Sequence, residues 1–472
     1  METECNGAQL EFQGLGRRRV VAAFDGGRIS SDGGVLLLRE VAARSGMLKR
    51  FAKCFIDYRE PELIEHTVAE LVSQRVLAQA QGYEDLNDHD SLRDDALLAL
   101  AAGKADLTGE QRVRERDRGH ALAGKSTLNR LELTPAQASA SERYHKIVYD
   151  AGAIERLLVA LFLDAHPKPP AEIVLDLDAT DDPLHGHQEG RFFHGFYRNY
   201  CYLPLYIFCG DFLLCAKLRS ADRDGAAGAV EEVARMVEQI RERWPRVRIT
   251  LRGDSGFARE ELMSWCEQNG VDYVLGLARN ARLEALLAEE LEQAKAEHEA
   301  SGLAVRRFKD FSYRTLDSWS RSRRVVGKAE YLPGKANPRF VVTSYPVERL
   351  EAAALYEELY CARGEMENRI KEQQLGLFAD RTSAATMRAN QLRLWLASIA
   401  YLLVNELRRV GLRGTELARA QVSTIRCRLL KLGALITLSV RRVAVALSSV
   451  FPLKRLFVRV LANIRRSYPL RA

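Results

Sequence analysis

The stretch Glu172–Thr180, EIVLDLDAT, decides the fold class of this chain of 472 residues. Its β-branched and apolar residues indicate a short buried strand, and the strand ends in acidic residues. Next, Cys201–Leu218 (CYLPLYIFCGDFLLCAKL) indicates two more strands, joined at a turn that contains Gly210. Helical and strand patterns then alternate over Ala226–Ala278. This order predicts an α/β protein built on a layered sheet of mixed direction.

Changes in composition on either side of this region predict the domain organisation. Helical patterns dominate before it, and the proline-rich segment His166–Pro170 marks a boundary. Strand patterns return after a long helix that ends near Ala300. The predicted parts are a disordered tail at 1–20, a helical DNA-binding or dimerisation domain at 21–165, an α/β core at 166–280 and 347–385, a β-rich insertion at 281–346, and a basic C-terminal region at 386–472.

The charge of the chain is strongly asymmetric. The whole chain carries +7, but residues 386–472 alone carry +15, so the remainder carries −8. A basic block rich in Leu, Val and Ile should fold, and its charge indicates a polyanionic partner such as DNA. The N-terminus lacks the apolar segment of a signal peptide, and the most apolar run, Leu394–Val404, is too short to span a bilayer. We therefore expect a cytoplasmic protein without a membrane partner.

The eight cysteines do not show the spacing of a zinc or redox site. Free thiols in a reducing compartment are the expected state, and a structural zinc ion is not expected.

Three acidic residues are candidates for a metal site. Asp178 ends a predicted strand, Asp254 lies where another strand enters the glycine turn RGDSG, and Glu367 lies on a later helix. Carboxylates at the ends of adjacent strands and on a packed helix can converge on one point. Three converging oxygen donors suit Mg²⁺. Two such ions can activate an attacking oxygen and stabilise the leaving oxygen of a phosphodiester.

The helix that carries Glu367 has a polar stripe. Tyr360, Arg363, Glu367, Lys371 and Gln374 follow one another at helical spacing, beside an apolar stripe that includes Ala362 and Met366. A surface ladder of charge pairs is one interpretation of the polar stripe. The other places Arg363 and Lys371 against the phosphate groups of a nucleic acid, one turn on either side of the metal-binding glutamate.

Eight segments occur in the order found in a known family: SSDGGVLLLRE, GYEDLNDHDSLRDD, STLNRLE, LDLDATDD, HGHQEG, RGDSGF, YCARGEMENRIKE and ANQLRLWL. With them the chain resembles the DDE transposases of bacterial insertion sequences, and most resembles insertion sequence family 1380. The family's Tyr-x2-Arg-x3-Glu-x6-Lys signature corresponds to Tyr360, Arg363 and Glu367. Its last position falls on Gln374, and Lys371, one turn earlier, is the expected substitute.

The resemblance implies an RNase H-like catalytic core with a β-strand insertion, in which Asp178, Asp254 and Glu367 bind Mg²⁺, with Mn²⁺ as a substitute. It implies cleavage at the inverted-repeat ends of a transposon, and joining of the freed 3′-OH to target DNA, by a homodimer or larger synaptic complex. Such a protein works in the bacterial cytoplasm, associated with the nucleoid. Two alternatives remain: a transposase-derived DNA-binding protein that is no longer catalytic, and a host nuclease with the same core.

Several residues keep two interpretations. Asp176 shares a strand face with Asp178, and we expect Asp178 to be the ligand and Asp176 a supporting group. Trp319, in a basic segment, either stacks on a DNA base near the cleaved end, as a tryptophan of the insertion does in related transposases, or belongs to a hydrophobic core. Tyr360 either stacks on DNA or forms the wall of the site. His185, His187 and His194 are expected in a loop or against the DNA backbone.

Overall fold

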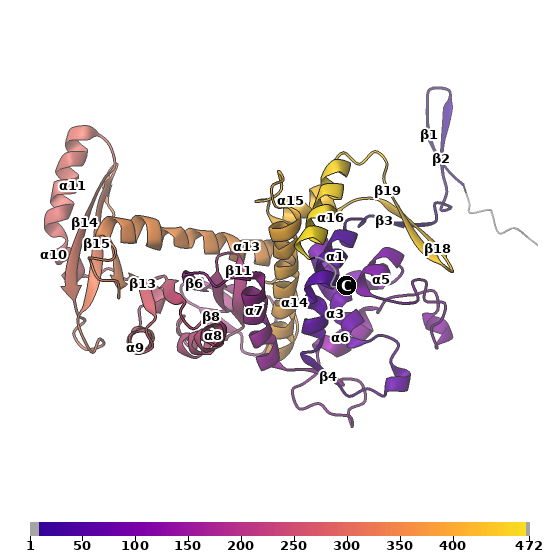
Figure 1. Ribbon diagram of the computed structural model, residues 1–472, viewed down its shortest axis with the longest axis horizontal. Helices are drawn as coiled ribbons and strands as arrows, with labels where there is room; N and C mark the ends of the chain where they lie inside the picture. The colour runs from indigo at the N-terminus through magenta and orange to yellow at the C-terminus, as the bar shows by residue number, and fades with distance from the viewer. Residues whose placement is uncertain (1–8, 469–472) are drawn as a thin grey trace, which may run out of the picture. The chain divides into compact units, whose positions relative to one another are not determined.

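The computed structural model describes residues 9–468, and its contacts divide the chain into two compact units (Figure 1). Unit 1 combines the residues up to Val148 with those from Ile399 onward, and unit 2 comprises Tyr149–Ser398. None of the described helices is long and apolar enough to cross a membrane.

Unit 2 begins at α7 (Ala151–Ala165), which sequence analysis assigned to the helical N-terminal domain. Val159 and Phe162 of α7 pack into the hydrophobic core that covers the sheet of this unit, so α7 belongs with the strands that follow it. The helices and strands of the first half are β6 (Glu172–Ala179), β7 (Asp182–Pro183), β8 (Phe192–His194), β9 (Asn199–Tyr202), β10 (Leu205–Cys209), β11 (Phe212–Lys217), α8 (Ala229–Arg243), β12 (Arg248–Gly253), α9 (Glu260–Gln268) and β13 (Asp272–Leu277).

The second half of unit 2 contains the predicted strand-rich segment and the helices around it. In chain order the elements are α10 (Ala281–Leu286), α11 (Ala288–Ser301), β14 (Val305–Tyr313), β15 (Arg323–Leu332), β16 (Lys335–Ala336), β17 (Arg339–Thr343), α12 (Ala352–Ala354), α13 (Gly364–Leu377) and the first part of α14 (Met387–Glu406), whose residues from Ile399 on are counted with unit 1. The long helix expected near Ala300 is thus two helices, which meet at the buried Leu287.

One mixed sheet organises unit 2, as the sequence predicts. Within the described residues it has nine strands, in the order β11-β10-β6-β12-β13-β17-β15-β14, with β16 paired to β15. Strands β6, β12 and β13 are parallel, and their neighbours on both sides are antiparallel. Strands β14, β15 and β17 continue this sheet, and α11 lies along β14 and β15 (Figure 1).

Alternation along the strands gives the sheet two different faces. Leu175 and Leu177 of β6 belong to the core shared with α7, α8 and α9. On the other face, Val274 of β13 packs against Leu355 and Tyr356. Asp176 and Asp178 have the opposite parity to Leu175 and Leu177, so they point away from the core of α7, α8 and α9.

Between α12 and α13 the helix is irregular. A π-helical turn, Leu355–Tyr360, is followed by a 3₁₀ turn, Cys361–Arg363, before α13 begins. The π turn contains one residue more per hydrogen-bonded ring than the α-helix, so it rotates the residues that follow it. Ala362, expected in the apolar stripe, is therefore exposed, and Met366 and Ile370 resume the buried face.

Unit 1 is built from segments at both ends of the chain. Its elements are β1 (Leu10–Leu15), β2 (Arg18–Ala22), β3 (Arg28–Ser30), α1 (Val35–Ser45), α2 (Met47–Ala52), β4 (Phe55–Asp57), α3 (Val68–Gln81), α4 (Asp88–Leu92), α5 (Ala96–Ala102), α6 (Lys125–Glu132), β5 (Ile147–Tyr149), α15 (Val422–Ile425), β18 (Ala434–Ser439), β19 (Arg442–Leu447) and α16 (Lys454–Ser467).

The two ends of the chain meet in a small sheet of order β19-β18-β3, in which Ala434 pairs with Ser30 (Figure 1). Gly34, at the start of α1, lies so close to Leu430 that a Cβ atom there would collide with its backbone. Lys431 Nζ lies 2.6 Å from the carboxylate of Asp32. The N-terminal part of unit 1 is therefore completed by C-terminal residues.

One expectation at the N-terminal end needs correction. Of the tail predicted at 1–20, the residues up to 8 lie outside the described part of the chain, but β1 and β2 pair as a hairpin between Leu10 and Ala22. Near the other end, α15 continues through Arg426–Leu430 as a π-helical turn, with Leu429 and Leu430 buried, and the strands β18 and β19 follow it.

Candidate active site

Asp178 and Asp254 come from neighbouring parallel strands. Asp178 lies near the carboxyl end of β6, and Asp254 directly follows β12, which pairs with β6 in parallel. Parallel strands present their carboxyl ends at one edge of a sheet, which brings these acids together. The turn after β12 is closed by the Asp254 side chain, whose Oδ1 accepts a hydrogen bond from the Gly256 N–H at 2.8 Å.

Glu367 is connected to the strand acids by Arg363. The Arg363 guanidinium donates from Nη2 to Glu367 Oε1 at 2.6 Å, and its Nη1 lies 3.5 Å from Asp178 Oδ1. Both residues lie on the irregular helix that covers this face of the sheet. The pairing is therefore more than a surface ladder along one helix, because Arg363 also contacts an acid of the sheet.

The electrostatics of Asp178 show that the acids act on one another. The pKa of Asp178 is raised to about 6, because burial and the charges of Asp254 and Glu367 raise it by more than the charge of Arg363 lowers it. Burial alone lowers the pKa of Arg363, but Asp178 and Glu367 reverse this and raise it. The three carboxylates thus share one electrostatic environment, with a guanidinium as its positive charge.

The donor set has the chemistry that a hard divalent cation requires, namely carboxylate oxygens from separate, rigid elements. Among the residues that the structure describes, no group of three His, Cys, Asp or Glu side chains is close enough to hold a metal ion. Arg363, paired with Asp178 and Glu367, lies where a cation would neutralise them. The residue types fit Mg²⁺, and Arg363 has to yield contacts for the carboxylates to bind it.

Asp176 has a different environment from Asp178. The residue is 4% exposed, and both carboxylate oxygens accept hydrogen bonds from Arg252, at 2.5 and 2.8 Å. Arg252 also donates to the carbonyl oxygen of Leu359, so this ion pair ties β6 and β12 to the helix that covers them. Sequence analysis did not single out Arg252.

Tyr360 lies inside the site rather than on its surface. Its hydroxyl faces Gly276 so closely that a Cβ atom added there would be 2.6 Å away. Its ring packs on the Tyr356 ring, with centroids 5.5 Å apart. Burial raises the pKa of Tyr360; the charge of Arg363 lowers it, and that of Asp254 raises it. Of the two interpretations, this position fits the wall of the site.

The end of the signature lies on the outer part of α13. Lys371 is exposed and makes no ion pair within residues 9–468. The Gln374 amide donates to the carbonyl oxygen of Asp181 at 3.2 Å. Asp181 lies in the loop directly after β6, the strand that carries Asp178. Lys371 is thus accessible to a phosphate, while Gln374 supports the loop after β6.

Trp319 does not occupy a position from which it can stack on DNA. It is 3% exposed and packs edge-on against the Tyr313 ring at 5.7 Å. The arginines around it, which suggested a basic surface, are held by acids or by the backbone: Arg321 by Glu267, Arg323 by Glu260 and Glu267, Arg324 by Asp310, and Arg314 by the carbonyl oxygen of Trp319. The DNA-stacking interpretation of Trp319 is therefore replaced by its alternative, a core tryptophan.

The histidines after β6 do not gather into a group. His194 packs against the Tyr197 ring at 4.9 Å, and His187 lies 3.5 Å from the Arg191 guanidinium. His185 is exposed. Their surroundings fit the expected loop positions.

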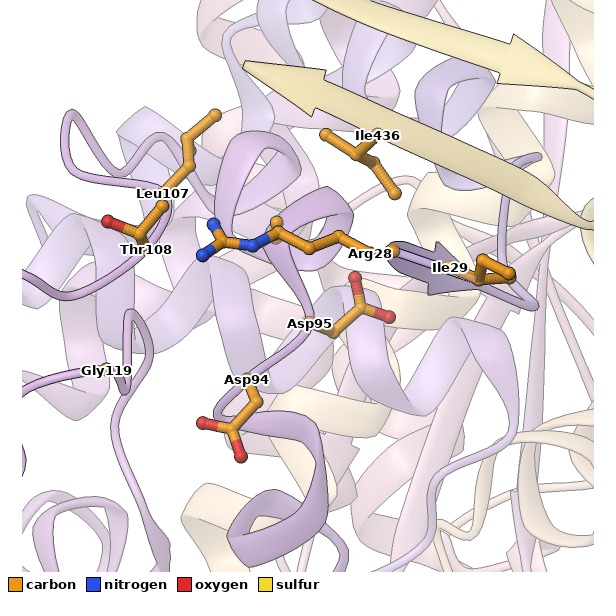
Figure 2. A pocket seen from close by; sticks show the side chains of 10 residues that line it. Arg28, Ile29, Asp94, Asp95, Leu107, Thr108, Gly119 and Ile436 are labelled. Atoms are coloured by element: carbon orange, nitrogen blue, oxygen red, sulfur yellow. The ribbon is translucent and has the colours of Figure 1, made fainter. Parts of the chain in front are cut away.

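A separate cavity of about 350 Å³ lies in unit 1, where Arg28 of β3 extends over Asp94 and Asp95 (Figure 2). Its acids already have structural partners. Asp95 caps α5 through the N–H groups of Leu97 and Leu98, and Asp94 pairs with His120. This cavity therefore lacks free carboxylates for a metal ion and is distinct from the acids of unit 2.

Comparison with known families agrees with the resemblance to DDE transposases noted in the sequence. A family model described as transposase DDE domain group 1 matches residues 12–469, nearly the whole chain. No curated protein shows significant sequence similarity to it. The match spans both units and includes Asp178, Asp254 and Glu367, and on this basis the chain belongs to the transposases of DDE domain group 1.

Proposed function

We propose that the protein is an active DNA transposase, which uses Asp178, Asp254 and Glu367 to cut at transposon ends and to join the freed 3′-OH to target DNA. The observation that carries this proposal is the shared electrostatic environment of three carboxylates from β6, the turn after β12 and α13. The strand order β11-β10-β6-β12-β13, with β6, β12 and β13 parallel, supports an RNase H-like core.

The residues of the site have separate roles in this proposal. Asp178, Asp254 and Glu367 would hold Mg²⁺ or Mn²⁺, which supplies activation of the attacking oxygen and stabilisation of the leaving oxygen. Arg363, released from Asp178 and Glu367, would contact the scissile phosphate through its planar guanidinium. Lys371 would contact the DNA backbone further along α13. Asp176 and Arg252 hold β6 and β12 in place, and a dimer or larger complex would bring two transposon ends together.

A non-catalytic DNA-binding protein is the second candidate, and one observation favours it. Arg363 pairs with both Asp178 and Glu367, so an internal cation already neutralises the site. The two candidates differ in whether the carboxylates bind a divalent cation, which can be measured without DNA.

The test combines metal binding with cleavage. Purified protein is titrated with Mn²⁺ and followed by electron paramagnetic resonance, and it is then incubated with Mg²⁺ and circular DNA that carries candidate ends. The wild type should bind Mn²⁺ and nick the DNA, and Asp178→Asn should lose both activities while remaining folded. Asp176→Asn is the matched control and should keep a measurable fraction of both. A folded wild type that neither binds Mn²⁺ nor nicks DNA would establish the non-catalytic candidate.

A further inference from the structure

The hairpin of β8 and β9, residues 191–200 with the sequence RFFHGFYRNY, exposes an unusual number of aromatic rings. Phe192 is 48% exposed, Phe193 49%, Tyr200 44%, and Phe196 at the tip 82%. Large aromatic side chains are usually buried, and a cluster of them on the surface indicates a binding site.

The rings are arranged as platforms with arginine beside them. Phe193 and Tyr200 pair across the hairpin in a T-shaped contact, with centroids 5.4 Å apart, and the Arg191 guanidinium lies 4.0 Å from the centroid of Tyr200. At the tip, Phe196 packs edge-on against Tyr197 at 5.0 Å. With 82% of its surface exposed, Phe196 remains accessible to a flat ligand despite this contact.

The tip is anchored beside the acids of the active site. The Tyr197 hydroxyl donates to the carbonyl oxygen of Ala179, the residue after Asp178, at 3.2 Å. Asn199 donates to Asp181 Oδ2 at 3.0 Å. Burial, together with the charges of Asp181 and Asp178, raises the pKa of Tyr197 to about 12. The exposed rings therefore belong to the immediate surroundings of Asp178.

The hairpin also carries positive charge that lacks an acidic partner. Within residues 9–468, neither Arg191 nor Arg198 forms an ion pair with a carboxylate, in contrast to the arginines around Trp319. Arg198 has a left-handed backbone (φ 57°), and its N–H donates to the His194 carbonyl oxygen, which closes the turn. The Arg198 residue is exposed. Arg191 is occupied by the Gly186 carbonyl oxygen and the Tyr200 ring, but the exposed Arg198 guanidinium and the exposed Phe196 ring, two residues apart, suit a phosphate backbone with unstacked bases.

From these features we infer that the β8–β9 hairpin binds unpaired nucleotides of a DNA strand next to the catalytic acids, with Phe196 stacking on a base and Arg198 contacting a phosphate. The inference rests on the proposed function, because it needs DNA at this site. Bases inside a duplex hide their faces, so the ligand is a frayed or single-stranded segment rather than intact double helix.

The test compares two DNA probes in the absence of divalent metal. One is a flush duplex, and the other is the same duplex with a short unpaired tail that contains 2-aminopurine, whose fluorescence is quenched by stacking. Wild-type protein should bind the tailed duplex more tightly and quench its fluorescence. Phe196→Ala should lower affinity for the tailed duplex about tenfold and leave the flush duplex within about twofold.

Matched variants distinguish the contributions of ring stacking, apolar contact and charge to binding of the unpaired tail. Phe196→Leu keeps apolar area and should behave as Phe196→Ala, whereas Phe196→Trp keeps a ring and should retain the preference. Arg198→Gln should weaken tail binding and its salt dependence. Phe24→Ala, at a 93% exposed phenylalanine of unit 1, should leave the ratio of the two affinities unchanged.

Two results would overturn the inference: wild-type protein without a preference for the tail, or Phe196→Ala with an unaltered preference. An altered oligomeric state of Phe196→Ala in sedimentation, with the preference unaltered, would make the hairpin a protein interface instead. The same preparations are assayed for Mg²⁺-dependent nicking. Tail preference without nicking contradicts only the catalytic proposal, and nicking without an effect of Phe196 contradicts only the hairpin.

Discussion

At the scale of single residues, a substitution of Asp254 is expected to affect catalysis much more than folding stability. Its carboxylate makes one local hydrogen bond, to the Gly256 N–H, so Asp254→Ala should cost only about 1 kcal/mol of unfolding free energy. The same change should abolish Mg²⁺-dependent nicking. Thermal melting and plasmid nicking measure the two effects. Asp222→Ala, at an exposed position of the same unit, is the control and should change neither; nicking by Asp254→Ala at the wild-type rate would remove Asp254 from the site.

His66 of unit 1 makes stability depend on pH. Burial, with the charges of Lys104 and Arg112, lowers the pKa of His66 from 6.5 to about 3. Below pH 6.5, His66 is therefore protonated in the unfolded chain but stays neutral in the folded protein. The free energy of unfolding thus decreases as the pH falls below 6.5. His66 should cause a loss of about 2 kcal/mol between pH 7 and pH 5.

Urea unfolding of the wild type and His66→Gln at both pH values checks this prediction. The variant should lack about 2 kcal/mol of the pH-dependent loss. His185→Gln, at an exposed histidine, should follow the wild type. Parallel curves for wild type and His66→Gln would show that His66 titrates alike in both states.

Trp319 should matter for stability rather than for DNA. It is buried against Tyr313 in the core that continues under the insertion strands, so Trp319→Ala should cost about 3–5 kcal/mol. Leu316→Ala, at a nearby 76% exposed position, should cost less than about 0.5 kcal/mol. Denaturant unfolding measures both; a Trp319→Ala protein of wild-type stability with defective end processing would restore the stacking interpretation.

At the scale of elements, α16 is an amphipathic helix with one apolar, buried side and one basic, exposed side. Leu456, Phe457, Val460 and Ile464 are buried, and the exposed side includes Arg455, Arg459 and Arg466. Replacing these three arginines with glutamine should preserve the fold and flatten the slope of log K against log salt by roughly 2 to 3, at about 0.9 per phosphate contact. Filter binding over a salt series measures the slope.

The control for α16 is Arg246→Gln, at an exposed arginine of unit 2, which should leave that slope within error. A triple variant with the wild-type slope would place the phosphate contacts of the protein elsewhere.

Most of the longer strands of unit 2 were predictable because they are apolar runs, several of them rich in β-branched residues, that end at turns such as the one at Gly210. Asp178 and Asp254 stand out in the sequence for a related reason, since acids at strand ends are visible there, and Glu367 stands out because it lies in a polar stripe at helical spacing. The π turn before α13 could not be predicted, because the sequence of Leu355–Glu367 fits regular helical spacing. The extra residue in the turn becomes visible only in the packed structure. Arg252 and the exposed rings of the β8–β9 hairpin also escaped notice, because burial and exposure depend on distant segments.

At the scale of the whole molecule, the two units have different spectroscopic reporters. The four tryptophans, residues 244, 265, 319 and 395, all belong to unit 2. Deleting residues 413–472 removes β18 and α16 from unit 1, so the N-terminal part should lose protection from proteolysis. Tryptophan fluorescence should keep its native emission while far-UV circular dichroism loses helix signal. A fluorescence shift to that of the unfolded chain would show that unit 2 depends on these residues.

The pairing of β3 with β18 also has a consequence for protein synthesis. Residues 28–30 leave the ribosome early, yet their strand partner, residues 434–436, follows some 400 positions later. At roughly 5–20 residues per second, the nascent N-terminal segment waits on the order of 20 to 80 s for its partner. Unit 2, which is continuous in sequence, can fold during that interval. Translation thus delays the completion of unit 1, so a ribosome that stalls before residue 434 releases a chain in which the large sheet of unit 2 is folded and unit 1 is unfinished.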